Sequence, residues 1–211
     1  MPGFNVATNF FTVLTIVANV VVVLIVAFGV AALVSSSARR AWTSMTRAVG
    51  AQAVLVAWLV AVVTTAGSLY YSEHLGFLPC ELCWYQRILM YPLVIVLGVA
   101  VLNRDRFVWI TGLVFVVLGV PLSLYHWLVE RVPSLAESTS CSVTAPCSAP
   151  YFEKFGYVTL AWMCMSSFLL IGSLLVISAT VPKDTSATAT PDHEESAPTV
   201  DAPPDSEEPA R

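Results

Sequence analysis

Four cysteines form two closely spaced pairs, and their spacing indicates thiol chemistry. Cys80 and Cys83 lie in the motif Cys-Glu-Leu-Cys, and Cys141 and Cys147 lie six residues apart. Closing so short a loop as Cys-x-x-Cys removes little chain entropy, so its disulfide is a poor structural staple. Such disulfides are commonly strained and reducible. The pattern therefore favours redox chemistry at the first pair.

Two other interpretations of these thiols stay open. All four can form structural disulfides, because an even set of cysteines outside the cytosol is typical of such bridges. Two close pairs can also supply four sulfur ligands to a metal ion. Arg87 lies one helical turn after Cys83, where its cation opposes a metal cation. We therefore expect no bound metal, and we expect Arg87 to lower the thiolate pKa or to hold a polar oxygen of a ligand.

Membrane helices must position these thiols, because the chain is too apolar for a soluble domain. Of its 211 residues, 57% are hydrophobic and 11% are charged, whereas a globular domain typically carries about 25% charged residues. This composition excludes a water-soluble core and a nucleic-acid-binding surface, and it predicts an all-α integral membrane protein. A span needs about 20 mostly apolar residues. The five expected spans are approximately 10–34, 49–72, 83–103, 107–129 and 155–181.

The third span includes a charged residue. Its charge-free part, residues 88–103, is too short to span, so the helix must begin near Cys83 and include Arg87. An ionisable residue there is costly and marks a functional site by default. The alternative is an arginine whose long side chain reaches the headgroups. Cys164, in the fifth span, is expected to pack as a small hydrophobic residue.

Basic residues give the spans a direction. Six of them lie on one side if the chain alternates regularly, and the positive-inside rule makes that side cytoplasmic. They are Arg39, Arg40, Arg47, Arg104, Arg106 and Lys183. We therefore expect a multi-pass protein of the cell membrane with its N-terminus and both cysteine pairs extracytoplasmic. Residues 182–211 hold eight of the 14 acidic residues and six prolines, so they predict a disordered, acidic cytoplasmic tail.

The residues around the first pair resemble a known family. The run 79–88, Pro-Cys-Glu-Leu-Cys-Trp-Tyr-Gln-Arg-Ile, closely resembles the signature of the DsbB/BdbC family of quinone-dependent thiol oxidases. The resemblance extends to Tyr125-His126, to Pro146-Cys147 and to residues 155–160, and it covers about residues 50–180. It implies a four-helix transmembrane bundle over 48–181. To this core the chain adds a transmembrane helix and a cytoplasmic basic loop within 1–47, and the tail 182–211.

The resemblance also implies a reaction. The enzyme reoxidises an extracytoplasmic thioredoxin-like dithiol oxidase (DsbA- or BdbD-like) and passes the electrons to membrane quinone, either ubiquinone or menaquinone. Cys141 matches the cysteine that the partner's thiolate attacks, and Cys147 then exchanges with Cys80. Cys83 matches the cysteine that reacts with quinone, and Arg87 matches the residue beside the quinone.

Further expectations concern other residues near these sites. If the fourth span runs outward, His126 lies at the depth of Arg87, where it contacts the quinone, assists proton uptake or is merely hydrogen-bonded. We expect the nearby glutamates to be solvated and the nearby aromatic residues to anchor the membrane interface. These residues are Glu130, Glu137, Glu153, Trp84, Tyr85 and Tyr151.

Two alternatives from other classes stay open. A vitamin K epoxide reductase-like protein also carries a Cys-x-x-Cys motif and a separate outer pair, but there the loop pair precedes the motif, whereas here it follows. The non-enzymatic alternative is a membrane protein with structural disulfides or a thiol metal site.

Overall fold

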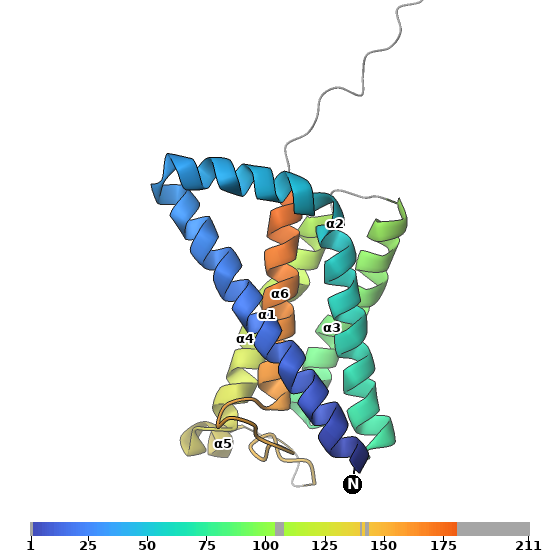
Figure 1. Ribbon diagram of the computed structural model, residues 1–211. Helices are drawn as coiled ribbons and strands as arrows, with labels where there is room; N and C mark the ends of the chain where they lie inside the picture. The colour runs from blue at the N-terminus through green and yellow to red at the C-terminus, as the bar shows by residue number, and fades with distance from the viewer. Residues whose placement is uncertain (1, 104–107, 140, 142–143, 181–211) are drawn as a thin grey trace, which may run out of the picture. The chain divides into compact units, whose positions relative to one another are not determined.

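The computed structural model describes residues 2–103, 108–139, 141 and 144–180. All belong to one compact unit. Its helices are α1 (Pro2–Val34), α2 (Ser36–Leu69), the π-helix η1 (Tyr70–His74), α3 (Glu81–Asn103), α4 (Val108–Val129), α5 (Pro133–Ser138) and α6 (Leu160–Ala179) (Figure 1). The predicted tail, the predicted span ends at 107 and 181, and Arg104, Arg106 and Lys183 lie outside the described residues.

Five helical segments are long and apolar enough to cross a membrane. They are Gly3–Val34, Gln52–His74, Glu81–Asn103, Val108–Val129 and Leu160–Ala179. The prediction of an all-α membrane protein with an additional N-terminal helix is therefore confirmed. Among the described residues, β pairing is limited to an isolated bridge between Lys154 and Val158.

The fifth span begins later than predicted, at Leu160 rather than at residue 155. The antiparallel bridge between Lys154 and Val158 closes a tight turn, in which Phe155 (φ 54°) and Gly156 (φ 74°) adopt the left-handed conformation. Thr159 then caps the helix, because its side chain accepts the backbone N–H of Trp162. The apolar run alone does not reveal this turn.

The basic segment after the first span is helical rather than a loop. Ser35, in an extended conformation (φ −120°, ψ 130°), separates α1 from α2, so Arg39, Arg40 and Arg47 all belong to α2. Figure 1 shows this first part of α2 running across one end of the unit before the chain turns into the second span.

Four helices form the bundle that holds the site. Helices α2 and α4 each pack against both α3 and α6. Small residues permit this close packing, because a Cβ added at Gly119 of α4 would lie only 2.6 Å from the ring of Phe168. The start of α1, the segment 75–80, α5 and the segment 144–159 lie at the same end of the unit (Figure 1). We call this end the cysteine end.

Candidate active site

The first cysteine pair lies at the N-terminal end of α3. Cys80 immediately precedes the helix, and its Sγ accepts the backbone N–H of Cys83 at 3.3 Å, as a capping side chain does. The two sulfur atoms are 2.8 Å apart. Unpaired N–H groups and the helix dipole make this end favourable for a thiolate. The local helix start thus supports charge development at the pair.

His126 lies beside Cys80 in the interior. It belongs to the last turn of α4 and is 3% exposed. Its Nε2 is 3.6 Å from Cys80 Sγ, and its Nδ1 is 3.4 Å from Oε1 of Gln86. Because an amide oxygen only accepts, Nδ1 carries the proton and Nε2 presents its lone pair to the thiol. Nε2 can therefore take the thiol proton, and the C-terminal end of α4 favours the resulting cation.

These contacts lower the pKa of the Cys80 thiol well below its ordinary value. The largest cause is the hydrogen bond with the Cys83 thiol, and burial opposes it by raising the pKa. The hydrogen bond and charge of His126, together with the Cys83 amide, lower it further. Cys80 is therefore the thiolate of the pair near neutral pH, and a thiolate of low pKa is a good leaving group in exchange.

Glu130 is buried, which corrects the expectation that it is solvated. Its side chain is only 5% exposed, and Oε2 accepts the hydroxyl of Thr159 at 2.6 Å. Oε1 lies 4.0 Å from Nε2 of His126. Burial raises the pKa of Glu130, and the Thr159 hydrogen bond only partly offsets it. A buried carboxyl group is therefore next to the histidine that contacts Cys80.

The second pair forms a disulfide, whereas the first pair is a dithiol. Cys141 and Cys147 are bonded, with 5.9 Å between their Cα atoms, and Cys80 and Cys83 carry free thiols. Cys147 is 3% exposed and packs in one buried cluster with Cys80, while Cys141 is only partly buried at the edge of that cluster. The fold therefore brings together two pairs that lie on separate segments of the sequence.

Arg87 is bound to α2 rather than to a sulfur atom. Its Nε donates to Ser68 Oγ at 3.0 Å, and its Nη2 donates to the Ser68 carbonyl at 3.1 Å. Its guanidinium also lies over the ring of Trp84, 5.2 Å from the centroid. Trp84 and Tyr85 are 52% and 46% exposed, as expected for residues at the membrane interface.

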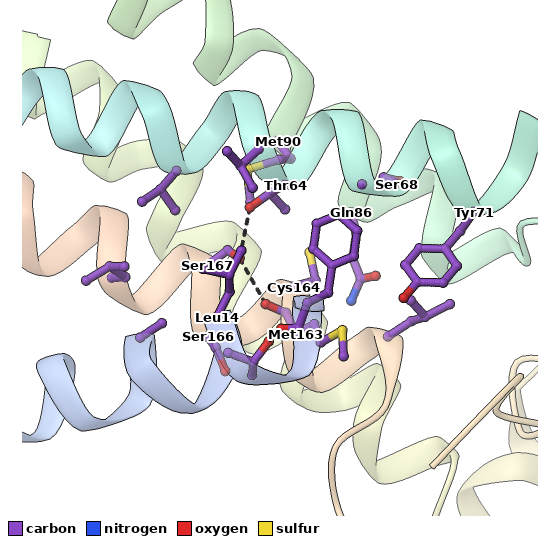
Figure 2. A pocket seen from close by; sticks show the side chains of 18 of the residues that line it. Leu14, Thr64, Ser68, Tyr71, Gln86, Met90, Met163, Cys164, Ser166 and Ser167 are labelled. Atoms are coloured by element: carbon purple, nitrogen blue, oxygen red, sulfur yellow. Dashed lines mark hydrogen bonds between the residues drawn. The ribbon is translucent and has the colours of Figure 1, made fainter. Parts of the chain in front are cut away.

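An apolar cavity of about 360 Å³ extends from Cys83 and Arg87 into the unit. This volume lies within the range of about 300–1,000 Å³ that is common for small-molecule sites. Its walls come from α1, α2, α3 and α6, and Figure 2 shows the side chains of Gln86, Cys164 and Leu14 around it. Cys164, expected only to pack, is part of this wall. Cys80 and His126 are not among the lining residues.

Three of these side chains are also potential metal ligands. The ligand atoms of Cys80, Cys83 and His126 all lie within 4.8 Å of one another. Sulfur and imidazole ligands suit Zn²⁺, but they bind it only when the thiols have lost their protons. Such a site is therefore compatible with the reduced pair alone.

Sequence reasoning assigned no role to two polar residues, Gln86 and Ser68, and took a third, Glu130, for a solvated group. Gln86 lies one helical turn after Cys83, and Glu130 lies one turn after His126, so helical spacing offers a signal for both. Ser68, which binds Arg87, belongs to α2 and lies 19 residues earlier in the chain. Only the packing of α2 against α3 reveals that contact.

Sequence comparisons identify known proteins that are similar to this chain. The sequence profile of the family described as "Disulfide bond formation protein DsbB" matches residues 47–178. Disulfide bond formation protein C of Bacillus subtilis is 43% identical over 114 residues, which cover 54% of this chain and 83% of that protein. A probable disulfide formation protein C of Halalkalibacterium halodurans is 40% identical, covering 59% of this chain and 92% of that protein.

A similar relative occurs outside these bacilli. A probable disulfide formation protein of Coxiella burnetii is 41% identical over 123 residues, or 58% of this chain and 84% of that protein. No solved structure shows a significant match to the chain. The matched region contains both cysteine pairs and excludes most of the residues before α2's membrane span.

Proposed function

Because the chain belongs to the DsbB family of disulfide bond formation proteins, we propose that it oxidises an extracytoplasmic thioredoxin-fold dithiol oxidase and reduces membrane quinone. One observation carries this proposal. Cys80 packs with Cys147 in one buried cluster, while Cys83 lines the apolar cavity. The pair thus shares a buried cluster with the loop disulfide, while its member Cys83 also reaches the space for a lipid-soluble acceptor.

The first steps are thiol–disulfide exchanges, in which each bond broken is replaced by a bond formed. A partner thiolate attacks Sγ of Cys141, the more accessible member of its pair, and Cys147 leaves as a thiolate. Cys147 attacks Cys80, and Cys83 leaves. The partner's second thiolate closes the partner's own disulfide and releases Cys141. Cys141 then attacks Cys147, and Cys80 leaves.

These exchanges end with a bonded outer pair and a reduced inner pair. Cys141 and Cys147 are again joined, and Cys80 and Cys83 are a dithiol. The lowered pKa of Cys80 favours its departure in the last exchange. His126, 3.6 Å from its sulfur, can hold the thiol proton at Nε2.

The cavity residues fit a quinone of the ubiquinone or menaquinone class. Gln86 Nε2 is a buried N–H group without a hydrogen-bond partner in the described part of the chain, and Arg87 lines the same cavity. Both residues can donate to a carbonyl oxygen, while the apolar walls accommodate an isoprenoid tail. When bound, the quinone accepts the two electrons and two protons that the Cys80–Cys83 dithiol loses on closing to a disulfide.

Topology is part of the proposal. We assign the cysteine end to the extracytoplasmic side, in accordance with the basic residues of α2 at the opposite end. Ser138 and Ser37 are both exposed, and they offer matched positions at the two ends. In intact cells, a membrane-impermeant maleimide should label Ser138→Cys and not Ser37→Cys. The reverse labelling would contradict the orientation.

The decisive experiment measures quinone reduction by the purified protein in nanodiscs with a reduced thioredoxin-fold partner. We expect turnover by the wild type and loss of turnover in Cys80→Ser and Cys83→Ser, because each removes half of the quinone-reactive pair. Alkylation followed by mass spectrometry supplies the second readout. Quinone should close the Cys80–Cys83 pair of the wild type to a disulfide. A pair whose oxidation state does not change with quinone would indicate a structural role.

A further inference from the structure

We propose that α1 forms a wall of the cavity and contacts the isoprenoid tail of the quinone, so that this helix determines which quinones the protein accepts. The inference rests on the proposed function, because it concerns the same cavity. The family match begins at residue 47, whereas α1 ends at Val34. The wall is therefore an element that this chain adds to the family core.

Specific contacts hold α1 in place. It crosses α6 and packs against both α2 and α6 (Figure 1). The ring of Phe11 lies so close to Gly67 of α2 that a Cβ there would be 2.8 Å from it. The hydroxyl of Tyr71 donates to Oγ1 of the fully buried Thr8 at 3.4 Å. These contacts fix which face of α1 meets the bundle.

That face lines the cavity. Its residues recur at helical spacing over about three turns. They are Phe11, Leu14, Thr15, Val17, Ala18 and Val21. Figure 2 shows Leu14 among the labelled side chains around the cavity, together with Met90 of α3 and Cys164 of α6. Five of the six α1 residues are apolar, so this wall suits a hydrocarbon chain.

The groups of the cavity that suit a quinone ring come from another helix. Cys83, Gln86 and Arg87 all belong to α3. A quinone ring that reaches Cys83 therefore places its tail along the apolar remainder of the cavity, of which α1 supplies a large part. This division predicts that substitutions in α1 change the binding of the tail, whereas substitutions in α3 change the binding of the ring.

The start of α1 is also linked to the segment that leads into α3. The ring of Phe4 lies 6.0 Å from the rings of Phe77 and Phe152. Phe77 stacks on Tyr151 with 4.2 Å between centroids, and the Tyr151 hydroxyl donates to the Leu78 carbonyl at 2.7 Å. The helix is thus packed against the cysteine end as well as along the cavity.

The test compares two identical substitutions on α1. Ala18→Phe fills the cavity, whereas Ala27→Phe adds the same ring at an exposed position outside it. With a long-tailed quinone, we expect Ala18→Phe to raise KM about tenfold or more and Ala27→Phe to leave it unchanged. KM for the reduced partner should stay unchanged in both. A quinone without a tail should show little difference between the variants.

Photolabelling provides a readout that does not depend on turnover. A quinone whose isoprenoid tail carries a diazirine should label residues within 11–21, and unlabelled quinone should suppress the adduct. Leu14→Ala, which removes a contact without filling the cavity, should reduce this labelling. Labelling confined to α2, α3 and α6, or an Ala18→Phe variant that behaves as wild type, would overturn the inference.

The wild type separates the two proposals. If it reduces quinone while α1 remains unlabelled, only the role of α1 fails. If the wild type neither reduces nor binds quinone, the proposed function fails, and the inference about α1 fails with it.

Discussion

Cys80 and His126 join two helix ends of opposite polarity: Cys80 precedes the N-terminus of α3, His126 lies in the last turn of α4, and 3.6 Å separates Sγ from Nε2. The first helix end favours a negative sulfur, and the second favours a positive imidazole. Both side chains are buried, so water screens their interaction weakly. The packing of α3 against α4 therefore places the Cys80 thiol and the His126 imidazole within reach of each other, at helix ends that both favour transfer of the thiol proton to the ring.

This relationship predicts the effect of His126→Asn on thiolate formation. We expect the thiolate titration of the reduced pair to move upward by about one to three pH units, because an adjacent positive partner is lost. Thiolate absorbance and alkylation rate, followed against pH, measure the change. His74→Asn is the matched control, since His74 is exposed and stacks on Tyr70. Equal titrations in both variants would contradict a role for His126.

Gln86→Leu tests the unpartnered amide in the cavity. The variant keeps a similar volume and removes Nε2 together with Oε1, which accepts from His126. Loss of the Nε2 donor should raise KM for quinone about tenfold, which corresponds to about 1.4 kcal/mol. KM for the reduced partner should be unaffected by loss of the donor. Gln52→Leu, at an exposed position of α2, provides the control. An unchanged KM for quinone in Gln86→Leu would show that the amide does not bind it.

Arg87→Ala should impair quinone use more than partner binding. The structure attaches this guanidinium to Ser68 and places it on the cavity wall. We expect a raised KM for quinone, by about tenfold or more, with an unaltered KM for the partner. Arg40→Ala, which removes an exposed arginine from α2, should behave as wild type. The opposite pattern in Arg87→Ala would refute its assigned role.

Glu130 predicts a pH-dependent stability. Its pKa is raised by burial, so between the unfolded and folded pKa values the folded chain holds more protons than the unfolded chain. Stability therefore falls as pH rises through this window. Glu130→Gln should raise Tm above that window by about 2–4 °C, the shift expected for about 1 kcal/mol. Below the window, the difference should vanish.

The control for this measurement is Glu137→Gln, because Glu137 is exposed. Thermal unfolding in nanodiscs across the pH range provides the data. A Tm difference that is independent of pH would mean that ionisation of Glu130 does not cause it.

Zinc should inhibit the reduced protein and spare the oxidised one. Only the dithiol presents Cys80, Cys83 and His126 together as ligands. We expect Zn²⁺ to slow alkylation of both thiols, a chelator to restore it, and His126→Asn to weaken the binding. Alkylation that needs a chelator before any zinc is added would instead favour a resident metal. Equal zinc binding by the oxidised protein would exclude this ligand set.

The sequence by itself determined the class of the protein and much of its chemistry. Five apolar runs specify the membrane helices, since no other element satisfies the backbone within lipid. The spacing of Cys80, Cys83 and Arg87 is local to one helix, so a helical repeat is sufficient to relate them. For the same reason, Gln86 was accessible to sequence reasoning, although it was overlooked.

Tertiary structure decided the contacts between helices. The proximity of His126 to Cys80, the anchoring of Arg87 by Ser68 and the burial of Glu130 all depend on how separate helices pack. The positions of these residues in the sequence do not determine those distances, because many helix pairings bury the same apolar faces. The late start of α6 arose from one left-handed turn, and the position of α1 along the cavity arose from contacts with α2 and α6.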